Sequence, residues 1–117
     1  MKLIAALAAA LLAGCSANEP RYKIAGSADN GRLLLRQYGC GACHRIPGVA
    51  TAYGNVGPPL HQISEQVYLA GVLPNTPANM IHWIRAPQAV DPLTAMPDLA
   101  VSEAHALDMA AYLYSLR

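Results

Sequence analysis

The sequence contains no phenylalanine, and aromatic residues of all kinds make up 6% of its 117 residues. Any core must therefore be built from Leu, Ala, Ile, Val and Met side chains. Charged residues are also scarce, at 13%, and eight basic residues nearly balance seven acidic ones. This balance leaves no basic footprint for nucleic acid and no charge run typical of a disordered tail. The length allows a single domain.

Cysteine is scarce too. Three cysteines are too few for the disulfide framework of a small secreted domain.

The N-terminus has the features of a secretory signal peptide: Lys2 is followed by an apolar run over 3–12, which is too short to cross a bilayer. Cys15 follows small residues and resembles the acylated cysteine of a bacterial lipobox. We expect a signal peptide over 1–14 and a lipid anchor at Cys15. An ordinary signal peptide with a chance cysteine is the alternative.

The lipidated protein would be an exported, membrane-anchored lipoprotein that faces the periplasm or the cell exterior. Small and polar residues from Ser16 to about Ala28, with Pro20 and Gly26 among them, predict a flexible tether. Residues 15–28 would thus join the lipid to a domain over 29–117.

That domain has the periodicity of helices and no alternating run long enough for a sheet, which predicts an all-α fold with long loops. The expected helices run from a cap at Asp29 or Asn30 to Tyr38 before Gly39, from about Ile63 to Ala70 before Gly71, from a cap at Thr76 to a stop before Pro87, and onward from a cap at Ser102. The segments over 45–59 and 87–97 should be loops, the second extended by its prolines. So irregular a chain needs a large apolar cofactor to complete its core.

The sequence Cys40-Gly41-Ala42-Cys43-His44 is C-x-x-C-H, the attachment motif of c-type haem. Two thiols at this spacing on a tight turn can each add to a vinyl group of one porphyrin edge, and the next side chain then lies over the ring face to bind iron. Small residues between the thiols let the backbone approach the macrocycle. The motif predicts one haem c, covalently bound through Cys40 and Cys43, with His44 as an axial ligand.

Two other interpretations of the motif are a redox-active dithiol and a zinc site. A thioredoxin-like dithiol should follow a strand in a βαβ pattern, which the sequence does not predict. Structural zinc needs four ligands, and no fourth one is clustered near the motif. Both interpretations explain the motif less well than haem attachment does.

The second axial ligand must come from elsewhere in the chain, with Met and His as candidates. Met96 lies in the proline-rich loop, whose stiff backbone suits a fixed thioether, and we predict it as the ligand. Met80 and Met109 fall within helices and should pack in the core. The remaining histidines are expected at the surface or beside the site: His61, His82 and His105.

From Asn30 to Leu116 the chain resembles a class I monohaem cytochrome c. The most similar variety is the bacterial domain associated with subunit II of haem-copper oxidases. The matching pieces, in the family's order, are Gly31, the Cys40–His44 motif, Gly57-Pro58-Pro59-Leu60, Leu73-Pro74-Asn75-Thr76-Pro77, Trp83-Ile84, Pro87, Pro92, Met96-Pro97 and Ala111-Tyr112-Leu113.

The resemblance implies further roles around the haem. The carbonyl of Pro58 should accept a hydrogen bond from Nδ1 of His44 and fix the imidazole. Leu60 should pack on the haem, Trp83 should lie against it on the methionine side, and Thr94 is expected to reach a haem propionate.

It also implies contacts away from the haem. Gly31 and Tyr112 should meet where the first and last helices cross, with Leu35 and Met109 packed around them. Relatives often carry Gly after the proline that precedes the ligand loop, whereas this chain has Leu93. Leu would be strained by about 1 kcal/mol or more if that position required a positive φ.

An iron with two protein ligands has no position for a substrate, so the predicted function is one-electron transfer and not catalysis. Donor and acceptor would be redox proteins of a respiratory chain, the acceptor a terminal oxidase. A fixed haem subunit of an oxidase or dehydrogenase complex is the alternative, and a peroxidase or gas-binding protein is a weaker one. After the signal peptide the only lysine is Lys23, so we expect docking through an apolar face with weak salt dependence.

Overall fold

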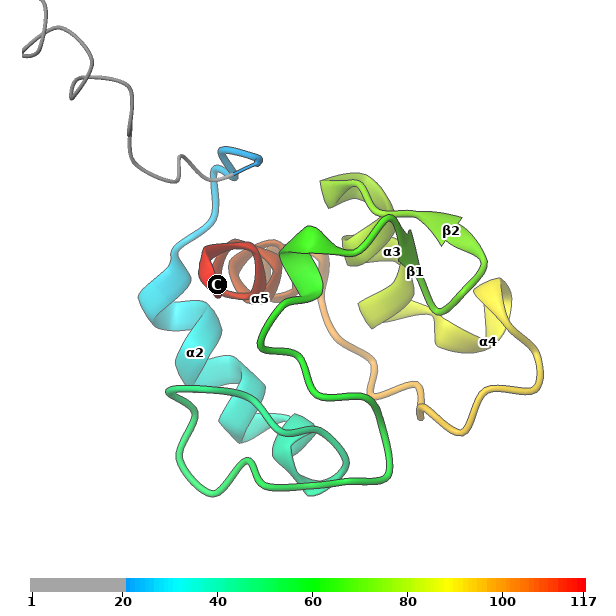
Figure 1. Ribbon diagram of the computed structural model, residues 1–117, viewed down its shortest axis with the longest axis horizontal. Helices are drawn as coiled ribbons and strands as arrows, with labels where there is room; N and C mark the ends of the chain where they lie inside the picture. The colour runs from blue at the N-terminus through cyan, green and yellow to red at the C-terminus, as the bar shows by residue number, and fades with distance from the viewer. Residues whose placement is uncertain (1–20) are drawn as a thin grey trace, which may run out of the picture.

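The computed structural model describes residues 21–117 (Figure 1), so the predicted signal peptide and Cys15 lie outside the described residues. The elements in chain order are α2 (Ala28–Gln37), a 3-10 turn (Cys40–Ala42), a second 3-10 turn (Ile63–Glu65), β1 (Tyr68–Leu69), β2 (Leu73–Pro74), α3 (Pro77–Arg85), α4 (Pro87–Val90) and α5 (Glu103–Ser115). The chain is thus mostly helical with one small antiparallel sheet. Within 21–117 no helix is long and apolar enough to cross a membrane.

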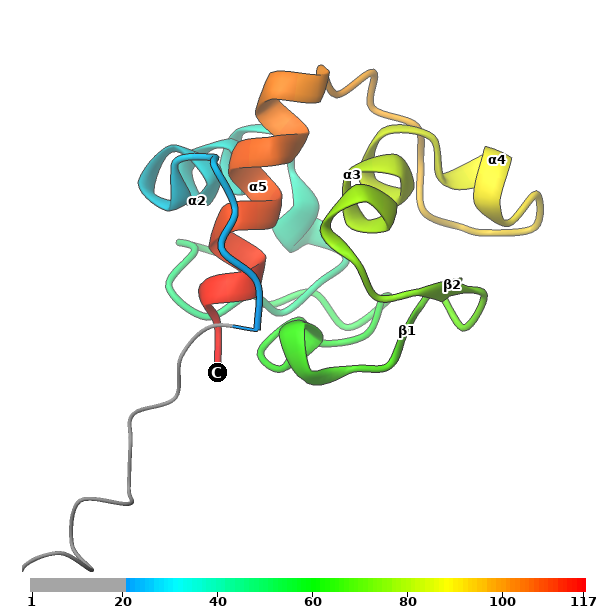
Figure 2. The same cartoon turned by 90° about the horizontal axis from the view of Figure 1, so that it is seen from above.

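The core forms where α2 crosses α5 (Figure 2). A Cβ on Gly31 would overlap the carbonyl of Asp108, so only glycine permits this approach of the two backbones. Leu35 and Met109 are buried beside the crossing, as predicted. At the crossing Gly31 faces the backbone of Asp108 and Met109, about one turn before Tyr112 on α5, and the Tyr112 hydroxyl donates to the carbonyl of Pro47.

The cap of α2 is Ser27, and the prediction of Asp29 or Asn30 was wrong. The Ser27 hydroxyl oxygen accepts a hydrogen bond from the backbone N–H of Asn30 at 3.2 Å. Asp108 of α5 then accepts from the Ser27 N–H and from the Asn30 side chain, both at 2.7 Å. These two hydrogen bonds hold the pKa of Asp108 below its usual value, and the bond from the Asn30 side chain has the larger effect. The end of the helix was predicted correctly, since Gly39 adopts a φ of 76°.

The segment over 21–27, here called the strap, runs alongside α5 (Figure 2). The Tyr22 ring packs edge-on against Tyr114, with ring centres 5.4 Å apart, and its hydroxyl donates to the Asn75 carbonyl at 3.2 Å. Gly26 lies so close to α5 that a Cβ would be 2.6 Å from the carbonyl oxygen of Leu107. The part of the predicted tether from Tyr22 onward is therefore packed on the domain.

The predicted helix over 63–70 is wrong, because it gives way to a 3-10 turn and then to β1. The buried Asn75 side chain donates to the carbonyls of Ile63 and Gln66, at 2.7 and 2.8 Å. A helix would need the Ile63 carbonyl for its own ladder. Ala70 and Gly71 then adopt positive φ values of 51° and 69°, which turns the chain into the antiparallel pair with Leu69 opposite Leu73.

The predicted caps of the last two long helices were correct, but the prediction for the segment from Pro87 was wrong. Thr76 caps α3 and Ser102 caps α5, each accepting a backbone hydrogen bond at 3.2 Å. The segment predicted as extended from Pro87 instead begins with the one-turn helix α4. Proline is compatible with the first helical position, and the N–H of Asp91 closes the turn on the Pro87 carbonyl at 2.9 Å.

Candidate cofactor site

One cavity of about 380 Å³ brings together the residues that the sequence singled out. This volume lies in the range of small-molecule and cofactor pockets. The predicted site residues that line it are Cys40, Cys43, His44, Pro58, Leu60, Trp83, Thr94 and Met96. Most of the other lining side chains are apolar, from α2, α3, α5 and the loops between them. The structure therefore brings these eight residues together at one cavity, although they come from segments far apart in the chain.

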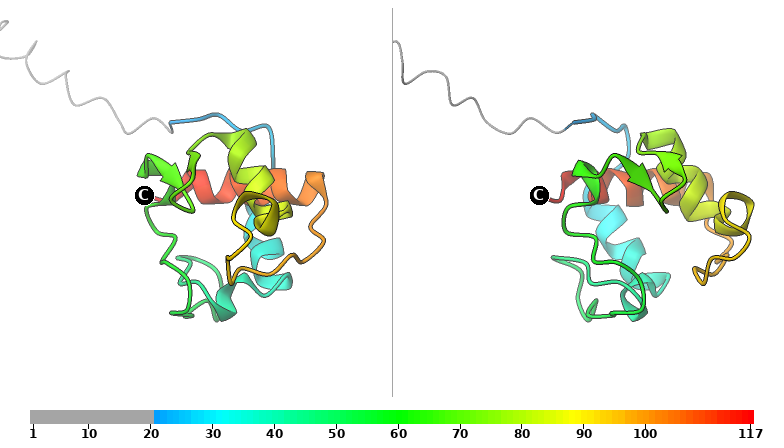
Figure 3. Two further views of the ribbon diagram at one scale, coloured as in Figure 1. Left: turned by 90° about the vertical axis from the view of Figure 1, so that its right-hand side faces the viewer. Right: turned by 45° about the vertical axis from the view of Figure 1, so that its right-hand side comes forward.

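The first wall is formed by residues 40–60, here called the attachment wall (Figure 3). It begins with the 3-10 turn, in which the His44 N–H donates to the Cys40 carbonyl at 3.0 Å. Glycine at position 41 has a structural reason within the wall, because a Cβ there would lie 2.7 Å from the Cβ of Ala52. The small residue thus lets the wall fold back on itself.

Both thiols of the turn are half-buried and free. Burial raises the pKa of the Cys40 thiol, with a smaller contribution from the neighbouring Cys43. Catalytic thiols of redox dithiols have lowered pKa values instead. Within residues 21–117, moreover, no three His, Cys, Asp or Glu side chains are grouped so that they could hold a metal ion. The described residues around the turn therefore offer no ligand group for tetrahedral zinc, and the raised pKa of Cys40 is opposite to the shift that activates a redox thiol.

The His44 imidazole is fixed from two sides. Its Nδ1 lies 2.7 Å from the carbonyl oxygen of Pro58, which is the hydrogen bond that the resemblance implied. Gly57 lies against the ring, and any Cβ at that position would overlap the imidazole. The Gly57 N–H is itself held by the Cys43 carbonyl at 2.8 Å. With Nδ1 engaged, Nε2 is the ring nitrogen left to bind a metal.

The second wall contains Met96, in the segment that joins α4 to α5 (Figure 3). The Met96 N–H donates to the Thr94 hydroxyl oxygen at 3.2 Å, and the Met96 carbonyl accepts from the Gln88 side chain at 2.7 Å. Thr94, which was expected to reach a propionate, here fixes the methionine backbone, and its hydroxyl hydrogen can still donate. Leu93 is not among the positive-φ residues over 21–117, so the expected strain at that position does not arise.

The other candidate ligands are placed as follows. Met80 and Met109 are buried in α3 and α5 as core residues, although both also reach the cavity. His61, His82 and His105 do not line it, and Nδ1 of His105 lies 2.8 Å from the hydroxyl of Tyr38. His44 is the only histidine that lines the cavity within the described part of the chain.

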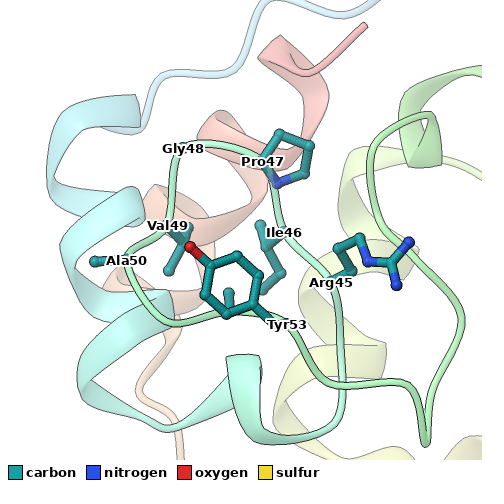
Figure 4. Close-up of a pocket in the computed structure, with 8 residues that line it drawn as sticks. Arg45, Ile46, Pro47, Gly48, Val49, Ala50 and Tyr53 are labelled. Carbon is teal, nitrogen blue, oxygen red and sulfur yellow. The ribbon is translucent and has the colours of Figure 1, made fainter.

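A second hollow lies within the attachment wall (Figure 4). The eight residues that line it all come from the segment 45–53. Arg45 is the only charged one, and Tyr53 is 78% exposed beside it. This lining contains no acid, thiol or histidine, so the cavity between the two walls is the candidate site.

Sequence reasoning missed the roles of two residues that organise the candidate cavity. Asn75 shapes its wall through Ile63 and Gln66, and Gln88 holds the carbonyl of Met96. Asn75 was given no role because its partners lie in a segment predicted as helix, and Gln88 because it lies on α4, where an extended segment was predicted. A scan against protein-family models found no match for this chain, and a search of the curated proteins found none either.

Proposed function

We propose that this protein is a one-electron carrier of the class I cytochrome c type, with one haem c bound covalently through Cys40 and Cys43. His44 and Met96 would be the axial ligands. The observation that carries the proposal is that these four residues, which are spread over more than half of the described chain, line one apolar cavity.

The residues of the cavity fit a haem. The thiols sit on a tight turn at one edge, an imidazole is held with Nε2 available, and a soft thioether lies in the other wall. The apolar lining suits a porphyrin face, and among the lining side chains only Asp91, His44 and the two thiols can titrate. Bound there, haem supplies an iron that changes oxidation state by one electron.

The chain's own residues would set how that electron is held. Pro58 orients His44 and raises its basicity, while Leu60 and Trp83 exclude water from the cavity. Neutral sulfur from Met96 favours the reduced state and raises the potential. The protein is proposed as a carrier and not an enzyme, because two protein ligands leave no iron position for a substrate.

The rim of the cavity suggests how partners dock. Val56, which lines the cavity, is 73% exposed, and Leu93, between the lining residues Asp91 and Thr94, is 94% exposed. Lys23, the single lysine of residues 21–117, belongs to the strap and not to the rim. Docking would therefore rest on apolar contact, with little steering by charge.

A lipid on Cys15 would compensate for the missing steering, by concentrating the protein at the membrane of its partner. Because the strap is packed from Tyr22 onward, only residues 16–20 and the start of the strap remain as tether. The acceptor proposed is a terminal oxidase. A fixed haem subunit of a larger complex is the second candidate, since so short a tether also suits a permanent partner, and co-purification in detergent would distinguish the two.

The test is the visible and near-infrared spectrum of the oxidised, haem-loaded protein, beside the variants Met96→Leu and Met80→Leu. The wild type should be low-spin with the weak methionine-to-iron charge-transfer band. Met96→Leu should lose the band, and the matched control Met80→Leu should keep it. A high-spin wild type, or a band that survives in Met96→Leu, would contradict the ligand assignment and with it the electron-carrier proposal.

A further inference from the structure

Most hydrogen bonds of the segment over 92–100, here called the ligand loop, go either to Asp91, the residue that ends α4, or to the loop itself. The Leu93 N–H donates to the Asp91 side chain at 3.0 Å and the Thr94 N–H to the Asp91 carbonyl at 3.1 Å. The Met96 N–H donates to Thr94, and the Ala100 N–H to Asp98 at 2.8 Å. Bonds of this kind shape the loop locally but do not attach it to the domain beyond Asp91.

Beyond the turn at Asp91, one hydrogen bond of the described chain attaches the ligand loop to a helix. Nε2 of Gln88 donates to the Met96 carbonyl at 2.7 Å. Gln88 stands on α4 directly after Pro87, which is among the most deeply buried residues of the protein. The next bond to a helix lies beyond the loop, where Nε of Arg85 approaches the Val101 carbonyl at 3.4 Å. The Gln88 bond therefore acts on the residue proposed as ligand, and its donor is held in place by the buried neighbour Pro87.

We propose that Gln88 is a positioning residue that holds the ligand loop closed and keeps the Met96 sulfur at the haem iron. The inference rests on the proposed function, because it assigns Gln88 a role only if Met96 is the ligand. Gln88 itself touches neither the cavity nor the cofactor. It acts through the peptide of Met96.

The physical argument concerns the equilibrium between a closed loop and an open one. An added small ligand such as imidazole binds ferric iron only in molecules whose methionine has left, so its apparent affinity is proportional to the open fraction. Removing one solvent-exposed hydrogen bond from the closed state should raise that fraction about two- to fivefold. The fold itself should change little, because Gln88 is exposed and its side chain makes no other hydrogen bond.

The experiment titrates the oxidised, haem-loaded protein with imidazole and follows the loss of the charge-transfer band. The variants are Gln88→Ala and Gln88→Glu, the second of the same length but with a carboxylate that cannot donate. The matched control is Gln37→Ala, an exposed glutamine at the end of α2 whose side chain has no hydrogen bond within residues 21–117. Amide hydrogen exchange at Met96 gives a readout that does not depend on added ligand.

Both Gln88 variants should bind imidazole about two- to fivefold more tightly than the wild type and exchange the Met96 amide faster, with Gln37→Ala unchanged. Unchanged imidazole affinity in both variants, with the band intact, would overturn the role of Gln88 and leave the proposed function standing. Absence of the band from the wild type would instead overturn the proposed function. If Gln88→Ala unfolds, Gln88→Glu decides the question, because it keeps the size of the side chain.

Discussion

The two walls of the cavity are held in different ways. In the attachment wall the Gly54 N–H donates to the Gly41 carbonyl at 3.0 Å, and the Leu60 N–H to the Arg45 carbonyl at 2.9 Å. The Tyr112 hydroxyl ties the same wall to α5 through Pro47. Arg32 of α2 also donates to the Gly48 carbonyl at 3.4 Å. Beyond the turn at Asp91, the ligand loop is joined to a helix by the single bond from Gln88. The attachment wall is thus bonded across itself and tied to two helices, whereas the ligand loop has one such tie.

This difference suits the proposed division of work. A wall that carries covalent attachment and an oriented imidazole must keep its geometry, because small displacements would change the ligand field. A loop that supplies one neutral thioether can be lightly held, since the iron–sulfur bond completes its attachment. Local opening of the protein should therefore occur mainly in the ligand loop, on the methionine side of the cavity.

The largest effect is expected from the attachment motif. Replacing both Cys40 and Cys43 by serine should abolish both thioether bonds and with them all haem that survives denaturation, because axial ligands release the cofactor when the protein unfolds. Haem staining of the denatured protein and its intact mass measure the loss. Cys15→Ser is the matched control, which should keep full haem content and release the protein from the membrane. Equal haem content in the two variants would contradict the assignment of Cys40 and Cys43.

Gly57→Ala tests how tightly the attachment wall holds its imidazole. The added Cβ would overlap the His44 ring, so the ring or the backbone must shift, and overpacking of this kind costs about 1–3 kcal/mol. Denaturant unfolding of the haem-loaded protein measures the free energy. Asn55→Ala, in the same exposed stretch, should change it little. If Gly57→Ala were equally stable, the wall would be more yielding than its hydrogen bonds indicate.

The third effect concerns the rim. Leu93→Glu places a charge on the apolar edge and should slow electron transfer to a purified haem-copper oxidase about fivefold, the size of a modest interface contribution. Reduction by ascorbate should not change. Leu33→Glu, also exposed but on α2, serves as the control. A wild-type rate that falls steeply with ionic strength would show that charge, and not apolar contact, guides docking.

Structural features were predicted from the sequence mainly where the contacts that fix them join residues a few positions apart. Caps at Thr76 and Ser102, the stop at Gly39 and the C-x-x-C-H turn depend on residues within a few positions of one another, and these predictions were correct. The hydrogen bond between His44 and Pro58, which are 14 positions apart, was predicted only from the resemblance to a family. Spacing alone would not have indicated it.

The failures involve side chains that act at long range. The cap at Ser27 is the exception, because its hydroxyl accepts from the Asn30 N–H only three positions away and serine is a favoured cap residue. The helix expected over 63–70 does not form because Asn75 takes the carbonyls of Ile63 and Gln66 from outside the segment. Gln88 was missed because its segment was expected to be extended, and in an extended segment its reach to Met96 could not be anticipated.

The smallest effect separates the two walls most directly. Tyr112→Phe removes the hydrogen bond from α5 to the Pro47 carbonyl and should destabilise the haem-loaded protein by about 1 kcal/mol. Imidazole affinity should stay at the wild-type value, because the ligand loop is not touched. Gln88→Ala should do the reverse, changing imidazole affinity and hardly changing the free energy of unfolding. Tyr68→Phe, whose exposed hydroxyl has no hydrogen bond within residues 21–117, controls for the loss of a phenol. If Tyr112→Phe loosened Met96 as much as Gln88→Ala does, the two walls would open together, and the contrast between them would have no functional meaning.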